Sequence, residues 1–173
     1  MDRTPLHEAL RESHAAFGEV DGWEMPRVFT NIKAEYLSGK GTVAAIDRSH
    51  WGRLKLTGAN RLDLLHRITT NDVKNLPAGH GAETVMCTDK GRIIDRLTVH
   101  ADADSTWVVV SPNMAEEIKG LIEKVRFRDD VQIEDLTHKT AMITLLGPAS
   151  AKMLEWVSRD QVHGLAPHAW KRL

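Results

Sequence analysis

The stretch from residue 64 to residue 99 constrains the fold more than any other part of this sequence. It joins the end of an amphipathic helix, a loop with one proline and two glycines, and two β-prone runs, Thr84–Thr88 and Arg92–His100. Between the two runs lies Asp89-Lys90-Gly91, a turn sequence in which glycine tolerates a positive φ. The sequence therefore predicts a β-hairpin over residues 84–100.

The rest of the chain mixes helical periodicity with short β-prone runs. Ser111 and Pro112 look like the N-cap and first residue of a helix, because both residue types favour those positions. Apolar residues at helical spacing predict helices over 5–17, 62–68 and 112–125 and after Gly147, and β-prone runs predict strands over 40–47, 53–57, 106–110, 131–134 and 141–145. Because these elements do not alternate strictly as βαβ units, we predict an α+β fold with a mixed or antiparallel sheet and packed helices.

Composition excludes several classes of function. The 173 residues carry 23 Lys and Arg against 24 Asp and Glu, so we expect no nucleic-acid partner. No apolar run has membrane-spanning length, and we expect no membrane partner. A single cysteine, Cys87, and the lack of a signal-like segment predict a cytoplasmic or organellar protein, not a secreted one, and we expect a cytoplasmic location. The nine histidines show no HExxH or similar spacing, so no metal site is predicted.

A series of short motifs, spread in order over nearly the whole chain, resembles the folate-binding family that contains the glycine cleavage T protein (aminomethyltransferase) and the YgfZ-type proteins that assist iron-sulfur enzymes. The motifs are Thr4-Pro5-Leu6-His7, Gly22-Trp23-Glu24-Met25-Pro26, Asp47-Arg48-Ser49, Leu56-Thr57-Gly58-Ala59, Thr70-Asn71-Asp72-Val73, Gly91-Arg92-Ile93-Ile94-Asp95 and Leu146-Gly147-Pro148. Family members are longer, so the resemblance implies that residues 1–173 are the N-terminal folate-binding portion without the C-terminal domains. In that arrangement, residues 1–50 and 140–173 could form part of a second lobe.

The resemblance implies tetrahydrofolate as the ligand and draws attention to Asp95 and Arg96. Aminomethyltransferases carry two consecutive acids here, and the second faces the folate near the nitrogen that receives the one-carbon unit. Asp95 matches the first acid, but Arg96 replaces the second. A guanidinium only donates hydrogen bonds and repels a cationic amine, which argues against aminomethyl transfer. Strand alternation puts Asp95 and Arg96 on opposite faces, so Asp95 could take over the catalytic role only through a bulge.

Other candidate cofactor-binding residues follow from the same resemblance. Met86 and Val109 would form apolar walls of a pterin cleft, although apolar strand residues are more often core. Asn71 would brace the loop beside the cleft or cap the preceding helix, and Ser111 is also assigned to the cofactor site. Arg96 could bind an anion such as a glutamate tail, or simply form an ion pair at the surface.

Three functions therefore stay open at this point. The first is a tetrahydrofolate-binding, YgfZ-like protein without aminomethyl transfer activity. The second is a tetrahydrofolate-dependent aminomethyltransferase, in which Asp95 reaches the cleft or the missing domains supply the acid. The third is a subunit or fragment whose cleft is completed by another chain or by a self-associated copy. We expect the 173 residues alone to bind folate weakly, because the resemblance places folate between domains.

Overall fold

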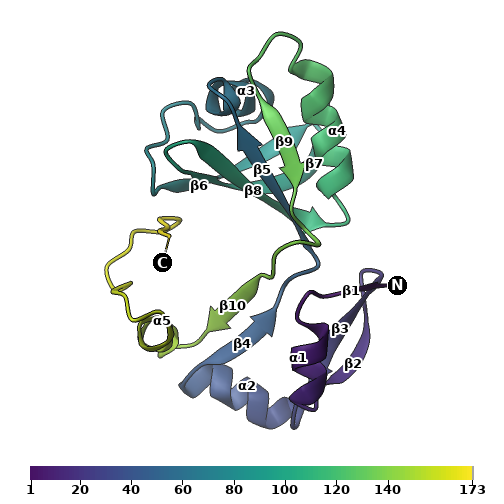
Figure 1. Cartoon of the computed structure of the whole chain (residues 1–173), viewed down its shortest axis with the longest axis vertical. Coiled ribbons are helices and arrows are strands. Elements are labelled where there is room, and N and C mark those ends of the chain that lie inside the picture. The colour runs from purple at the N-terminus through teal and green to yellow at the C-terminus, as the bar shows by residue number, and fades with distance from the viewer. Residues whose placement is uncertain (173) are drawn as a thin grey trace. The chain divides into compact units, whose positions relative to one another are not determined.

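The computed structural model describes residues 1–172, which form two compact units (Figure 1). The first unit contains Met1–His50 and His138–Leu165, and the second contains Trp51–Thr137 and Ala166–Arg172. The chain therefore forms most of the first unit and then the main part of the second. It next adds residues 138–165 to the first unit and residues 166–172 to the second. Helices and antiparallel sheets coexist in the chain, and the α+β prediction is confirmed.

The second unit is built on a five-stranded antiparallel sheet with the strand order β6-β7-β8-β5-β9. The predicted hairpin is present as β6 and β7, and Gly91 in its turn has a φ of +72°. The elements of this unit are β5 (Trp51–Thr57), α3 (Arg61–Ile68), β6 (Gly81–Cys87), β7 (Ile93–Ala101), β8 (Ser105–Pro112), α4 (Ala115–Val125) and β9 (Gln132–Asp135).

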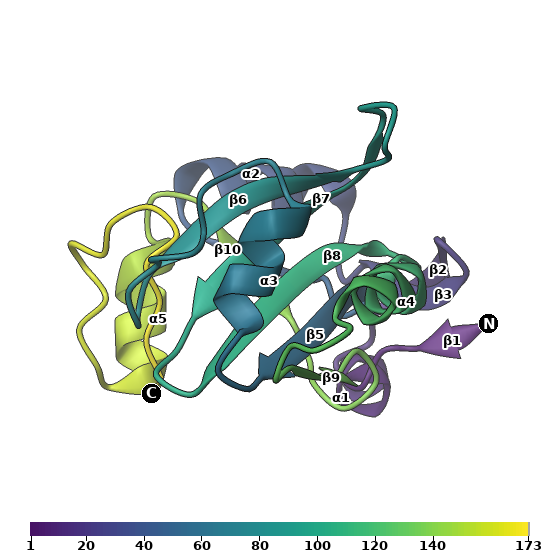
Figure 2. The same cartoon turned by 90° about the horizontal axis from the view of Figure 1, so that it is seen from above.

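Helices α3 and α4 cover one face of this sheet (Figure 2). Leu64 and Leu65 of α3 and Ile118 and Ile122 of α4 are fully buried in one cluster with the apolar residues of the strands. These strand residues are Leu54, Leu56, Met86, Leu97, Val99, Val108 and Val110, and most of them alternate with half-buried or exposed residues. Burial of this surface drives folding of the unit and decides which strand residues point away from the helices.

The first unit holds two small sheets and three helices. Its elements are β1 (Asp2–Arg3), α1 (His7–Glu12), β2 (Ala16–Val20), β3 (Trp23–Val28), α2 (Ile32–Gly41), β4 (Ala44–Asp47), β10 (Ile143–Leu146) and α5 (Ser150–Ser158). Strands β1, β3 and β2 form one sheet, and β10 pairs antiparallel with β4. Helix α2 was not predicted, because its apolar residues do not gather on one face, and all ten of its residues are exposed or half-buried.

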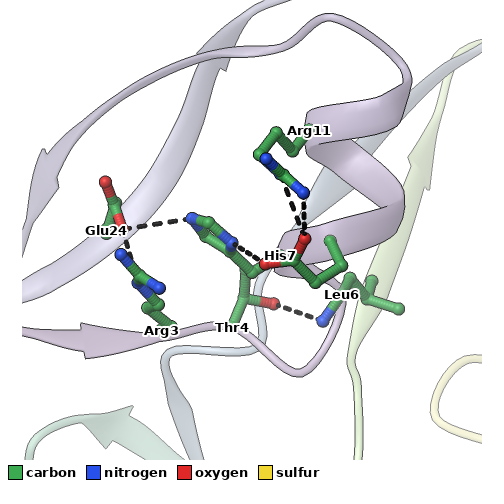
Figure 3. A network of polar contacts seen from close by, with 7 residues as sticks. Arg3, Thr4, Leu6, His7, Arg11 and Glu24 are labelled. Atoms are coloured by element: carbon green, nitrogen blue, oxygen red, sulfur yellow. Dashed lines mark hydrogen bonds and ion pairs between the residues drawn. The ribbon is translucent and has the colours of Figure 1, made fainter.

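The Thr4-Pro5-Leu6-His7 motif starts α1, and its His7 side chain contacts Glu24 of β3 (Figure 3). The buried His7 ring lies between two carboxylates, with Nε2 3.1 Å from Glu24 Oε2 and Nδ1 3.3 Å from Glu8 Oε1. Arg3 Nε donates to Glu24 at 2.8 Å. The motif therefore has a structural role in this unit, because it fixes the entry into α1.

Two expected helix boundaries are wrong. Ser111 and Pro112 do not start a helix: β8 continues through Pro112, which pairs with Trp51 of β5, and α4 begins at Ala115 after Met114. The helix expected over residues 5–17 ends at Glu12, because His14 takes a φ of +62° and the chain turns into β2. In both places a neighbouring strand provided backbone partners that the local sequence pattern does not reveal.

Residues 166–172, here called the 166–172 segment, pack on the second unit at the ends of β6 and β7. Trp170 N and Nε1 donate to the carbonyl oxygens of Gly79 (2.9 Å) and Ala101 (2.8 Å). Arg172 pairs with Asp102 at 2.7 Å. The packing is close at Gly81, where a Cβ atom would lie 2.5 Å from the carbonyl oxygen of His168.

His100 lies beneath this segment, where its ring meets the edge of the Trp170 ring. Burial, together with the nearby His168 ring, holds the pKa of His100 below its ordinary value. Between that lowered pKa and the ordinary value of 6.5, the unfolded chain binds more protons at this position, so stability falls as the pH falls through 6.5. On acidification from about pH 7.5 to about pH 5.5, we expect the wild-type chain to lose more thermal stability than His100→Gln. Equal losses in parallel melting curves would contradict this prediction.

Candidate functional site

Hairpin register places a group of side chains on the sheet face opposite α3 and α4. Val85 pairs with Arg96, Glu83 with Thr98, and Thr98 with Val109 on the next strand. Directly paired residues project to the same side of a sheet. We call this surface the Arg96 face and define it by Glu83, Val85, Arg96, Thr98, Trp107 and Val109.

Asp95 lies on the opposite face and is buried, with 6% of its surface exposed. Its Oδ1 accepts from Ser111 Oγ at 2.6 Å and from the Arg96 amide at 2.8 Å, and its Oδ2 accepts from the Ser111 amide at 2.9 Å. The β7–β8 ladder ends at the Thr98–Val109 pair, so this carboxylate bonds the two strands where they part. Asp95 is thereby held in a structural position away from the Arg96 face.

A bulge lies next to Asp95, but it does not turn the carboxylate around. Cys87 pairs with Ile93 and Met86 with Asp95, so Ile94 is the extra residue. From Asp95 to Ala101, buried residues alternate with exposed or half-buried ones, as predicted from the sequence. The bulge therefore does not bring Asp95 to the face of Arg96, as a catalytic role for Asp95 would require.

Arg96 projects from β7 with 59% of its side chain exposed. Its guanidinium Nη1 lies 3.5 Å from Glu83 Oε1, and the Glu83 side chain is 44% exposed. An exposed pair of this kind adds little to stability, at most about 1 kcal/mol. The Arg96 face thus presents a cation and an anion side by side, surrounded by Val85, Thr98 and Val109.

Asn71 fixes the loop after α3 against β6. Its Nδ2 donates to the carbonyl oxygen of Glu83 at 2.8 Å, and its amide donates to Thr84 Oγ1 at 3.0 Å. The preceding Thr70 exchanges backbone and hydroxyl hydrogen bonds with Val85. The residue that caps the C-terminus of α3 is Thr69, so Asn71 braces β6 and does not cap the helix.

The remaining candidate residues do not form one group. Val109 lies on the Arg96 face, whereas Met86 is 4% exposed in the core on the helix side, so these two residues cannot be opposite walls of one cleft. Ser111 is a partner of Asp95, as described above. Met86 instead borders a hollow of about 590 Å³ between the ends of α3 and α4 and the hairpin, whose lining includes neither Asp95 nor Arg96.

Glu83 was missed by sequence reasoning, which placed Thr98 on the face of Arg96 but named no partner on the next strand. The turn at residues 89–91 fixes the hairpin register, and counting outward from it, with one bulge, would have placed Glu83 opposite Thr98 and beside Arg96. The sequence gives no sign of the bulge at Ile94.

Within residues 1–172, no three His, Cys, Asp or Glu side chains gather as metal ligands, and no helix is long and apolar enough to cross a membrane.

Comparison with known proteins extends these observations to the whole chain. Aminomethyltransferases from Bacillus pumilus and Thermotoga maritima are each 30% identical to it, over 96% and 99% of its length and 46% and 48% of theirs. The crystal structure of glycine cleavage system aminomethyltransferase T from Bartonella henselae matches with a TM-score of 0.89 at 21% identity, over 99% of this chain and 48% of that one. The chain therefore spans about half the length of these relatives.

The family model described as the GCVT N-terminal domain matches residues 6–170. The match covers nearly all of the chain and agrees with the fold of the structural neighbour. The family resemblance of the sequence motifs is thus confirmed. The chain belongs to the GCVT N-terminal domain family.

Proposed function

We propose that this chain is a binding module for a reduced folate, with the Arg96 face as its folate-contacting surface, and that it does not transfer aminomethyl groups. One observation carries the proposal: Arg96 is exposed on this face while the carboxylate of Asp95 is buried on the other. The aminomethyltransferase relatives support a folate ligand. Val85, Thr98 and Val109 offer a partly apolar surface for a flat ring.

The chemistry of Arg96 argues against aminomethyl transfer. A guanidinium stays protonated and cannot accept a proton or a hydrogen bond from the reacting amine. It would also repel the positive charge that develops when an aminomethyl group reacts. The same side chain still suits a binding surface, because a guanidinium can pair with and orient a neighbouring carboxylate.

We also propose that the chain belongs with the YgfZ-like branch of the family. That assignment rests on the replaced acid, and a role beside iron-sulfur enzymes is part of it. A cytoplasmic location is proposed with it, supported by the single cysteine.

A protein partner is proposed for the first unit. Helices α2 and α5 and strand β10 expose large apolar side chains, namely Ile32, Tyr36, Leu37, Ile143, Leu146, Trp156 and Val157. Large apolar side chains exposed in this number are typical of surfaces that are covered by protein. We propose that the covering protein is equivalent to the remaining half of the relatives, with self-association of this chain as the alternative outcome.

The binding proposal is tested by titrating the ¹⁵N-labelled chain with 5-formyltetrahydrofolate and recording amide chemical shifts. We expect weak but saturable shifts, with Kd in roughly the millimolar range, that are largest at Val85, Arg96, Thr98 and Val109. The control ligand is p-aminobenzoylglutamate, which lacks the pterin. Shifts that are absent, or that centre on the hollow at Met86, would overturn the proposal.

The second half of the proposal is tested by an assay for methylene-tetrahydrofolate. The chain is incubated with tetrahydrofolate and an aminomethyl donor. We expect no product above the reaction without protein. Product formation by the wild-type chain would restore the aminomethyltransferase alternative.

A further inference from the structure

Glu83 is a carboxylate on the Arg96 face that no motif points to. It comes from β6, one strand away from Arg96, and its Oε1 lies 3.5 Å from the guanidinium Nη1. Its side chain is 44% exposed, so the carboxylate remains accessible to a ligand. The exposed surface therefore keeps an acceptor group although Asp95 is buried and Arg96 is a cation.

The backbone at Glu83 is held from both sides of β6. On one side it pairs with Thr98 of β7. On the other side, Asn71 Nδ2 donates to its carbonyl oxygen at 2.8 Å, and Thr70 donates to the carbonyl oxygen of Val85 at 3.0 Å. A strand that is hydrogen-bonded along both edges has little freedom to shift, so the backbone that carries the Glu83 carboxylate is held in place.

Asp95 cannot act as a hydrogen-bond acceptor on the Arg96 face. Its two oxygens already accept three hydrogen bonds in a buried position on the helix side. The paired Glu83 carboxylate, in contrast, has lone pairs left over, because an ionised carboxylate offers about four acceptor sites. The neighbouring cation also offsets its charge, which reduces repulsion toward an anionic ligand.

We propose that Glu83 is the group that accepts hydrogen bonds from N–H donors of the ligand on this face, and that Arg96 is a positioning residue that orients the Glu83 carboxylate. The inference rests on the proposed folate-binding function. It assigns a ligand of stated chemistry: a flat, reduced heterocycle that carries amine or amide N–H groups. Arg96 acts here through Glu83, so the two side chains form one functional unit.

The test is a double-mutant cycle on folate affinity, measured by the same ¹⁵N shift titration. We expect Glu83→Gln to weaken binding of 5-formyltetrahydrofolate about tenfold, since a charge-assisted hydrogen bond becomes a neutral one. Arg96→Gln should weaken it less, and Arg96→Lys should restore most of the loss. In the double variant, the Arg96 substitution should add little to the Glu83 substitution, because its effect passes through Glu83.

The matched control is Glu134→Gln, an exposed glutamate of β9 that pairs with Lys55 at the far edge of the same sheet. It should leave affinity unchanged, and the unfolding free energy of all variants should stay close to that of wild type. If wild type binds and Glu83→Gln binds equally well, this inference fails while the folate site stands. Additive losses in the double variant overturn the role of Arg96, and a wild-type chain that does not bind folate overturns both proposals.

Discussion

Asp95→Ala is expected to lower the free energy of unfolding by about 2–4 kcal/mol. The substitution removes the carboxylate that accepts three hydrogen bonds. The three donors that lose this acceptor are the Ser111 amide, the Ser111 hydroxyl and the Arg96 amide. Because Asp95 is 6% exposed, water cannot readily replace the lost partner. Urea unfolding at neutral pH measures the change.

The control for this prediction is the neighbouring residue. Arg96→Ala removes an exposed ion pair and should change the same free energy by less than about 1 kcal/mol. If the two substitutions were equally mild, Asp95 would not be the bond between β7 and β8. A large loss of stability also means that an activity lost in Asp95→Ala is not evidence for a catalytic carboxylate.

Gly58→Ala is expected to destabilise the second unit by roughly 3 kcal/mol or more, because backbone strain and a steric clash act together. Gly58 has a φ of +101°, and a Cβ atom there would lie 2.1 Å from the carbonyl oxygen of Asp130. The clash cannot relax easily, since Asp130 is tied to the same loop by hydrogen bonds with Ala59 and Asn60. Thermal and urea unfolding should both show the loss.

Gly91→Ala separates the two causes. Gly91 also has a positive φ, +72°, but a Cβ atom there would meet no neighbour within 4 Å. Its substitution should cost only the backbone strain, about 1 kcal/mol. A Gly58→Ala variant no less stable than Gly91→Ala would contradict the close approach of Gly58 to Asp130.

Local patterns predicted the fold well where the turn or the periodicity was decisive. The hairpin at β6 and β7 followed from Gly91 and two β-prone runs, and α3 and α4 followed from apolar residues at helical spacing. The prediction failed at Ser111, whose sequence suits a helix start. In the structure Ser111 belongs to β8, and its hydroxyl donates to Asp95. Helix α2 escaped detection because its apolar residues do not share a face.

For the candidate site, sequence reasoning gave the opposite orientations of Asp95 and Arg96 but not their partners. Alternation alone separates neighbours on a strand, and this part holds from Asp95 onward. Glu83 was missed because its closeness to Arg96 depends on cross-strand register, including a bulge that leaves no mark in the sequence. Met86 was grouped with Val109 because the family resemblance places both at a pterin cleft, although the pleat sends them to opposite faces.

The 166–172 segment has a consequence for anyone who divides this protein into pieces. A cut after Thr137 would seem to release a complete five-stranded sheet with both of its helices. Such a piece would lack Trp170, the donor to the carbonyl oxygens of Gly79 and Ala101, and would uncover His100. The shortest fragment that keeps the sheet intact must therefore carry residues that lie about thirty positions further along the chain, joined to it covalently or supplied as a peptide.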